Sequence, residues 1–152
     1  MRTNAGREVA GSLAGADGVL RCAKIPMPIL IRSIDHQRNE IDAVAFGPIH
    51  YDEVEKHLLE ERSIRGLSYK EFIDARDVEL LFALSPAEIR QIVALVRNLC
   101  QQSKFGATAV LVSNDYAFGI MRAMEVLLED VADIRPFRDE KLARSWLASK
   151  PN

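Results

Sequence analysis

The sequence predicts an α/β domain in which an N-terminal β-hairpin is followed by elements in the order α-β-α-β-α-β-α, over a mainly parallel five-stranded sheet. Residues 108–112 form a short, uncharged run of β-branched and apolar residues, typical of a strand buried on both faces. Turn and helix-capping residues follow at once, and then an amphipathic helical pattern. Strand–helix pairs of this kind recur along the chain, and their alternation indicates right-handed crossovers with helices packed on the sheet.

The two strands of the hairpin are joined by polar residues 35–40, a connection too short for a parallel crossover. Asp52 and Glu53 open the helix that follows, where carboxylates complement the helix dipole. Residues 78–84 are apolar but form too short a run to assign. The expected strands span residues 28–34, 41–46, 69–75, 108–112 and 132–137, and the expected helices span residues 51–62, 86–103, 116–130 and a short segment after residue 139.

Two helices have clear start signals. Ser85 and Glu88 form a capping box with Pro86 at the first helical position, and Asp139 caps the last helix. The helix over residues 116–130 has a long apolar stripe, made of Ala117, Ile120, Met121, Met124, Leu127, Leu128 and Val131. The two methionines of this stripe either line a flexible hydrophobic pocket, which would suit a lipid-like ligand, or simply fill the core.

Composition excludes several classes of protein. With 152 residues the chain is long enough for one domain with a proper core. A net charge of −2 gives no general attraction to nucleic acid, and no apolar run approaches the ~20 residues that cross a bilayer. Cys22 and Cys100 match no metal or redox spacing, so we expect reduced thiols and a cytoplasmic location.

Residues 1–26 are expected to form a flexible N-terminal extension, and residues 27–149 a single domain. Four of the eight glycines fall within the first 24 residues, without a sustained hydrophobic period. Glu8 and Asp17 interrupt the apolar region that a secretory signal needs. The sequence leaves open whether translation starts at Met1 or at Met27.

Three passages carry a family resemblance: residues 47–53 (GPIHYDE), residues 113–119 (SNDYAFG) and residues 137–147, which begin Phe-Arg-Asp and end Trp-Leu. In order and spacing they resemble the SpoIIAA-like fold shared by anti-sigma factor antagonists and the STAS domains of transporters. The chain is more similar to the small bacterial STAS-like proteins of uncharacterised function, which have also been compared with CRAL-TRIO lipid-binding domains. The resemblance implies this fold and a homodimer.

One passage departs from the pattern of the anti-sigma factor antagonists that the chain resembles. In those proteins, the strand matching residues 69–75 leads into an Asp-Ser-Ser/Thr-Gly signature whose second hydroxyl is phosphorylated by a partner kinase. Here the corresponding residues are Asp74, Ala75, Arg76 and Asp77. Since Ala75 and Arg76 replace both hydroxyl residues, no phosphoester can form, and the phosphorylation switch does not carry over.

The turns after residues 69–75 and 108–112 should meet at the carboxyl edge of the parallel sheet, where ligand sites commonly lie. The helix amino terminus near Tyr116 and the charge of Arg76 would favour an anion or carboxylate, and Tyr116 and Phe118 would supply an apolar wall. Alternatively, Asn114 or Asp115 merely caps the helix while Arg76 pairs with its acidic neighbours. The candidate ligand-binding residues are Asp74, Arg76, Asp77, Ser113, Asn114, Tyr116 and Phe118.

His50, Glu53 and His57 have the spacing of one helix face. A metal site would need further converging ligands, so we expect an exposed polar face, and neither a metal nor another cofactor. Cys100 lies on an apolar stripe and should be a core residue. No nucleophile elbow, phosphate-binding loop or zinc-protease motif occurs in the sequence.

Two functional hypotheses follow. The first is a non-enzymatic regulatory or binding domain of the STAS-like class, acting through protein contacts or a small anionic or apolar ligand, and forming a homodimer. The second is a small carrier of a lipid or other hydrophobic ligand, or an enzyme, with a pocket at the carboxyl ends of the central strands. A filled interior would favour the first, and an apolar pocket with converging polar groups the second.

Overall fold

The computed structural model describes residues 28–63, 66–79 and 84–152. The expectations for residues 1–26, for Cys22 and for most of residues 78–84 lie outside this part of the chain.

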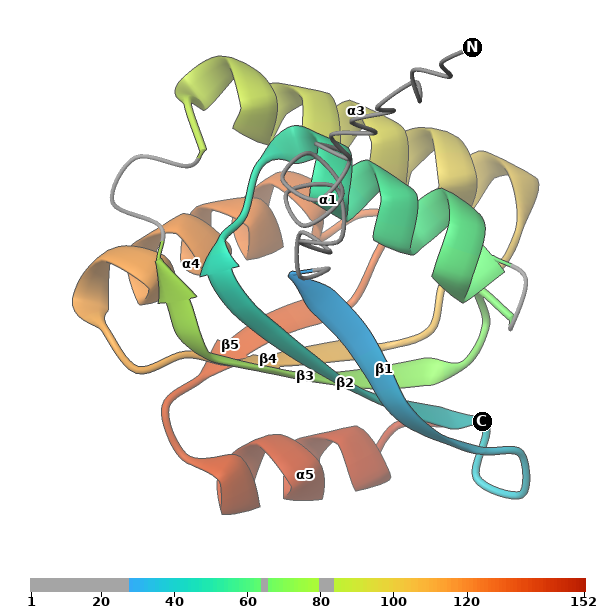
Figure 1. The fold of residues 1–152 in the computed structure, drawn as a ribbon. Helices are drawn as coiled ribbons and strands as arrows, with labels where there is room; N and C mark the ends of the chain where they lie inside the picture. Colours follow the sequence, from blue (N-terminus) through green and yellow to red (C-terminus); the bar gives the residue numbers. More distant parts are fainter. Residues whose placement is uncertain (1–27, 64–65, 80–83) are drawn as a thin grey trace, which may run out of the picture.

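A five-stranded sheet, with its strands in chain order, forms the middle layer of the molecule (Figure 1). Strand β1 (Ile29–Asp35) runs antiparallel to β2 (Glu40–Pro48). Strands β3 (Lys70–Glu79), β4 (Thr108–Leu111) and β5 (Ile134–Phe137) each run parallel to the strand before them. The predicted hairpin and the mainly parallel sheet are therefore both confirmed.

The helices divide unequally between the two faces of the sheet. Successive right-handed crossovers in one direction place their helices on a single face. These are α1 (Tyr51–Lys56), its continuation η2 (His57–Arg62), α3 (Pro86–Gln102) and α4 (Asp115–Leu128). Helix α5 (Glu140–Ala148) packs alone on the opposite face, against β3, β4 and β5 (Figure 1).

The predicted helix starts are formed by the expected hydrogen bonds. The Ser85 hydroxyl accepts the amide of Glu88 at 3.2 Å, and the Glu88 carboxylate accepts the amide of Ser85 at 2.8 Å. The Asp139 side chain accepts the amide of Leu142 at 2.9 Å, at the start of α5. Local side-chain chemistry thus fixes where these two helices begin.

Two of the expected elements differ from the sequence analysis. Strand β3 continues to Glu79, because the ladder with β2 resumes after a register shift and pairs Asp77 with Phe46. Arg76 and Asp77 consequently lie within a strand and not in the turn after it. Leu127, placed on the apolar stripe of α4, is 47% exposed, since the buried face of that helix runs through Ala117, Met124 and Leu128.

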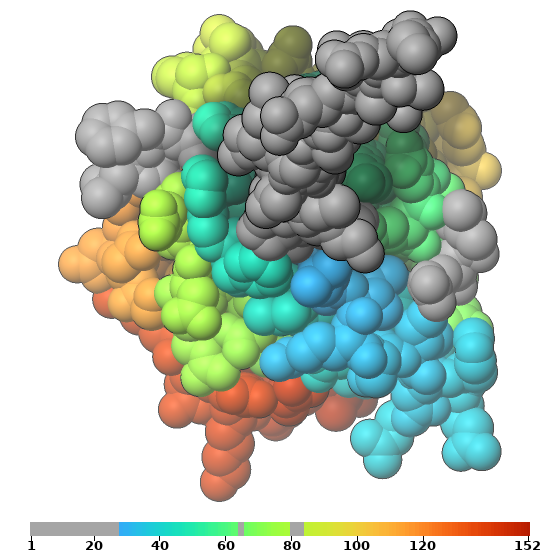
Figure 2. Space-filling model, in the orientation of Figure 1, coloured from blue at the N-terminus to red at the C-terminus, as the bar shows by residue number. Residues whose placement is uncertain are grey.

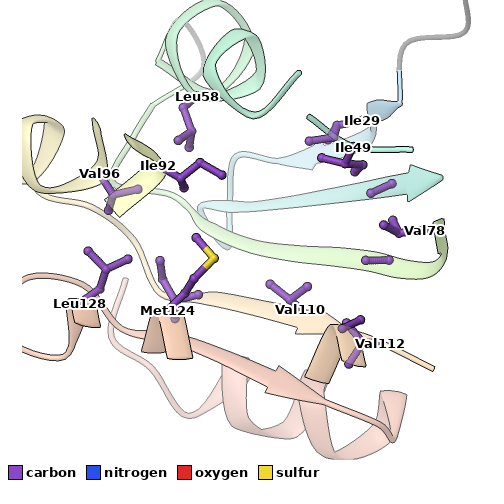
Figure 3. Close-up of a cluster of buried hydrophobic side chains, with 14 of the residues drawn as sticks. Ile29, Ile49, Leu58, Val78, Ile92, Val96, Val110, Val112, Met124 and Leu128 are labelled. Atoms are coloured by element: carbon purple, nitrogen blue, oxygen red, sulfur yellow. The ribbon is translucent and has the colours of Figure 1, made fainter. Parts of the chain in front are cut away.

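Two apolar cores lie on the two faces of the sheet. The smaller core, under α5, is made of Phe72, Ala109, Leu111, Ala143 and Leu147. The larger one lies between the sheet and the layer of α1, η2, α3 and α4 (Figure 3). Cys100 is half-buried against the larger core, as expected, and burial raises the pKa of its thiol.

The β1–β2 hairpin turn projects from the body of the molecule in Figure 2. Asn39, at the end of this turn, has a positive φ of 50°, a conformation that asparagine tolerates better than most residues. His36 in the same turn is exposed and lies 3.0 Å from the hydroxyl of Tyr69. Among the described residues, no helix is long and apolar enough to span a membrane.

Candidate functional site

The larger core contains a cavity of about 140 Å³. It lies where the strands present small side chains, such as Ala45 and Ala75, to the helix layer. Ile92 and Met124 reach toward the sheet from α3 and α4 and line the cavity on the helix side (Figure 3). Most protein interiors are packed without voids of this size, so the cavity is a specific feature of this core.

The cavity wall is almost entirely apolar along its length. It extends from Thr108, at the amino end of β4, to Val112 and Val78 near the carboxyl ends of the strands. Met121 and Met124, for which the sequence left pocket and core both open, line the cavity as part of the larger core. A cavity of this size lined by apolar side chains is expected to stay dry, but it can accept a compact apolar molecule.

A group of buried charged residues borders the same cavity. His57, Arg62 and Glu71 are 3%, 1% and 0% exposed, respectively, and all three contribute to the cavity wall. His57 Nε2 lies 2.6 Å from Glu71 Oε1, and Arg62 Nη1 lies 3.0 Å from Glu71 Oε2. The other ring nitrogen of His57 is 3.3 Å from Glu61 Oε2, so the four residues alternate in the sign of their charges.

Arg62 also connects the loops that lead into two strands. Its Nη1 donates to the hydroxyl of Thr108, and its Nη2 donates to the carbonyl oxygens of Tyr69 and Gly106, all at 3.1 Å. The guanidinium stacks over the ring of Phe105, with 4.0 Å between its central carbon and the ring centroid. This arginine therefore closes the amino-terminal end of the cavity.

The pKa values in this group follow from burial opposed by charge pairing. Burial would lower the pKa of His57, but its hydrogen bond to Glu71 and that residue's negative charge raise it above its ordinary value. Burial would raise the pKa of Glu71, but Arg62 and His57 together hold it below its ordinary value. Both shifts favour the charged forms of His57 and Glu71, so the pairing stabilises the ionised network.

The local geometry of η2 explains why His57 and Arg62 share a face. A π-helix bonds each amide to the carbonyl five residues earlier, as the amide of Ser63 does with the carbonyl of Leu58. Residues five apart then lie one above the other, whereas in an α-helix they diverge. Because each π-helical turn holds about one residue more than an α-helical turn, His57 and Arg62 both lie toward Glu71 on β3. Such π-helical turns often occur at functional sites.

The strand-end residues predicted from the sequence lie outside this cavity wall. Arg76 makes a two-armed ion pair with Asp74, at 2.9 and 2.7 Å, and its Nη2 lies 3.5 Å from Glu140. The hydrogen bond from Arg76 is the main reason that the pKa of Asp74 is lowered. Ser113 donates its hydroxyl to the carbonyl of Arg76 at 2.8 Å, so the two strand ends do meet. Asp77 is exposed.

The remaining predicted residues surround the start of α4. The Asn114 side chain accepts the amide of Ala117 at 2.8 Å and so caps the helix. Tyr116 is 49% exposed, and Phe118 packs against the larger core under the guanidinium of Arg138. The helix cap and the ion pair of Arg76 are the structural alternatives that the sequence analysis named, and both are present.

The expected exposed polar face of the first helix is wrong for His57, which is buried. His50 and Glu53 remain near the start of α1, where the amide of His50 donates to the Glu53 carboxylate at 2.7 Å. In the part of the chain that the structure describes, no group of three or more histidine, cysteine or acidic residues could hold a metal ion.

Comparison with known proteins bears on the fold. No protein-family model and no curated protein matches the chain. A solved structure that does match is that of an uncharacterised protein of the DUF3478 family with a SpoIIAA-like fold, from Shewanella loihica PV-4. The match has a TM-score of 0.51 and covers 78% of this chain and 93% of that chain. This chain has the SpoIIAA-like fold. At 18% identity the likeness extends to the fold alone.

Within this SpoIIAA-like fold, sequence reasoning missed Arg62 and Glu71 as site residues. Both lie among charged neighbours, and no local pattern separates them from solvated residues. One weak signal was available for Glu71, because it directly precedes Phe72, an apolar residue that the strand pattern places in the core. A charge at such a position requires a buried partner.

Proposed function

We propose that this chain is a non-enzymatic binding domain that holds a small apolar molecule in the cavity between the sheet and its helix layer. The observation that carries the proposal is the apolar cavity of about 140 Å³ in the larger core. A void of this size costs stability when empty, and an apolar ligand would recover that loss by restoring contacts with the wall.

The charged residues at the cavity border support binding over catalysis. His57 and Glu71 have the side-chain types of a general base and a general acid, but each is held by ion pairs inside the protein. A residue committed to such a pair has no proton to exchange with a bound molecule without disrupting the network. Ligand occupancy beneath the helix layer would also give a regulatory domain a signal to pass to a protein partner.

Binding of benzene to the full chain tests the proposal, because benzene matches a cavity of this size. We expect a saturable rise in Tm with benzene concentration, as for any ligand that binds only the folded state. Amide resonances from residues around the cavity should shift in nuclear magnetic resonance spectra over the same concentration range. The absence of both effects at saturating benzene would contradict the proposal.

Two variants distinguish the cavity from the strand-end site. Ala75→Leu adds three carbons at the cavity wall and should abolish benzene binding while the fold is kept. Arg76→Ala, at the adjacent exposed position of the same strand, removes the cation of the strand-end site and should leave binding unchanged. The reverse result, loss of binding with Arg76→Ala alone, would place the ligand at the strand ends, as the sequence first suggested.

A further inference from the structure

One face of α4 is apolar and exposed along about three helical turns. Tyr116, Ile120, Ala123 and Leu127 follow one another at three- and four-residue spacings, so they form a single row on the helix, called here the α4 row. Tyr116 and Leu127, at the two ends of the row, are 49% and 47% exposed. Contiguous apolar surface of this kind marks an interaction site, whereas single exposed apolar residues are ordinary.

A glycine beside the row has no structural reason within the described chain. Gly119 is exposed in the middle of α4, where glycine is less favourable than alanine. A Cβ at this position would meet no atom within 4 Å, and the φ of Gly119 is not positive. The missing side chain would instead let a second backbone approach the helix closely from outside.

An uncompensated positive charge lies on the α3 side of the row. Helices α3 and α4 run in the same direction, and Arg97 on α3 reaches α4, where it donates to the carbonyl of Leu127 at 2.7 Å. Two turns earlier on each helix, Arg90 and Ile120 occupy the corresponding positions. Arg90 is exposed, and among the arginines that the structure describes it is the one without an ion-pair partner.

The shape and charge of this surface determine which partner fits. A straight apolar row of about three turns matches the stripe of an amphipathic helix. A strand would need unpaired backbone groups to bond with, and the face of a helix offers none. The charge of Arg97 is already compensated by Asp130 at 2.8 Å, whereas that of Arg90 is not, so a carboxylate from the partner fits beside Arg90.

We propose that the α4 row is the docking site for an amphipathic helix of a partner protein, with acidic residues on the flank that lies over α3. The apolar stripe of the partner packs along the α4 row, its backbone comes closest at Gly119, and a carboxylate pairs with Arg90. An interface of this size is typical of a weak, transient signalling contact. The inference goes beyond the cavity binding proposed above and does not depend on it.

Two synthetic helical peptides with the same leucine stripe test this proposal, one with glutamates on both flanks and one with lysines. Fluorescence anisotropy of each labelled peptide, titrated with the full chain, measures its affinity. We expect the glutamate peptide to bind roughly fivefold or more tightly than the lysine peptide, because only the former pairs with Arg90. Amide resonances of α4 and of the adjoining face of α3 should shift on binding.

Three variants test the residues that carry the proposal. Leu127→Lys should weaken binding of the glutamate peptide roughly tenfold, and Arg90→Glu should reverse the preference between the two peptides. Gly119→Gln should weaken binding without lowering the midpoint of urea unfolding, because glutamine favours the helix but blocks close approach. Leu142→Lys is the matched control, an exposed leucine on α5, and should leave binding unchanged.

Several outcomes would overturn the proposal. It is wrong if the glutamate peptide does not bind at millimolar concentration, or if its binding shifts resonances elsewhere. Equal affinity for the two peptides would show that the surface does not select acidic partners. If Leu127→Lys converts a dimer of the chain to a monomer, a second copy covers the row. If phosphatidylglycerol vesicles bind the unaltered chain but not Leu127→Lys, the row docks on a membrane.

Discussion

At the scale of single residues, Arg62 joins several elements of the fold through its buried side chain. Its side chain contacts the segments before β3 and before β4, and it neutralises Glu71 inside the sheet. Removing one member of such a buried ion pair leaves the other charge uncompensated, which typically costs about 3–5 kcal/mol. The network thus fixes how η2 sits on the sheet as much as it shapes the cavity.

The first prediction concerns the pH dependence of stability. The pKa of His57 is raised in the folded protein, so its contribution is complete below the unfolded value of about 6.5 and is lost as the pH rises through the folded pKa. The pKa of Glu71 is lowered, so its contribution is present above its unfolded value of about 4.3 and is lost as the pH falls through the folded pKa. The network should be most stabilising between these two limits.

We therefore expect the free energy of unfolding, measured with urea, to fall as the pH rises above about 6.5. His57→Gln keeps a donor for Glu71 but cannot titrate, so it should remove this part of the pH dependence. His36→Gln, in the exposed hairpin turn, is the control and should leave it unchanged. An equal slope in the unaltered chain and in His57→Gln would show that another group is responsible.

The second prediction concerns a glycine that holds the network in place. A Cβ on Gly106 would lie 2.0 Å from the carbonyl oxygen of Tyr69, so the backbone would have to move. That carbonyl and the one of Gly106 both accept hydrogen bonds from Arg62, and the shift would disturb them together. We expect Gly106→Ala to lower the free energy of unfolding by about 2 kcal/mol or more, because the added Cβ would overlap with the backbone.

Gly119 supplies the control for this substitution. It is exposed in the middle of α4, and a Cβ there would meet no atom within 4 Å. Gly119→Ala should therefore raise the free energy of unfolding by about 0.5–1 kcal/mol, through helix propensity. Urea unfolding of both variants measures the difference. An equal change in the free energy of unfolding in the two variants would mean that Gly106 does not lie close to Tyr69.

The sequence predicted the roles of single residues only where those roles depend on residues nearby in the chain. Asn114 and Ser85 could be proposed as helix caps because a cap depends on neighbours within three residues. His57 could not, since its burial depends on Glu71, which lies fourteen residues away on another element. The helical spacing of His50, Glu53 and His57 indicated a polar face, and the π-helical geometry of residues 57–62 has no signature in the sequence.

At the scale of elements, the cavity arises because strands with small side chains face helices whose side chains are of ordinary size. Ala75 on β3 faces the helix layer and borders the cavity, whereas Ala109 on the adjacent β4 faces α5 in a filled layer. The two alanines are both buried, and they differ in whether space lies beyond the methyl group.

The third prediction compares these two sites. Ala75→Val adds two methyl groups into free space and should be neutral or raise the free energy of unfolding by up to about 1 kcal/mol. Ala109→Val adds the same atoms to a packed layer and should lower it by about 1–3 kcal/mol. Chemical denaturation of both variants measures the contrast. A similar loss of unfolding free energy in both variants would indicate that the cavity collapses in solution, so that no free space lies beside Ala75.

Elements were predicted better than the site because their signals are periodic and local. Buried strands and amphipathic helices repeat their apolar residues every two or every three to four positions, which a sequence shows directly. The bulge that extends β3 past Ala75 depends on its register with β2, and this lies outside the sequence pattern. As a result, Arg76 and Asp77 were expected in a turn but lie within the strand.

At the scale of the whole molecule, the single direction of the crossovers determines where a ligand can bind. Helices α1, η2, α3 and α4 all cover one face of the sheet (Figure 1), and the cavity lies between these helices and the sheet. The thinner side is closed over β3, β4 and β5 by α5, whose Arg144 joins β2 through an ion pair of 2.9 Å with Asp42.

The last prediction is that the chain forms a dimer. Strands β1 and β5 are the two edges of the sheet, and no other described strand pairs with the outer side of either. Leu30 on β1 is 40% exposed, and pairing of β1 with its copy in a second chain would bury it while satisfying the edge amides and carbonyls. Leu30→Lys should therefore shift sedimentation from dimer to monomer, because a lysine on an edge strand opposes such pairing. Val126→Lys, at a 57% exposed position on α4, should leave the dimer intact. A single monomeric species of the unaltered chain at high concentration would contradict the prediction.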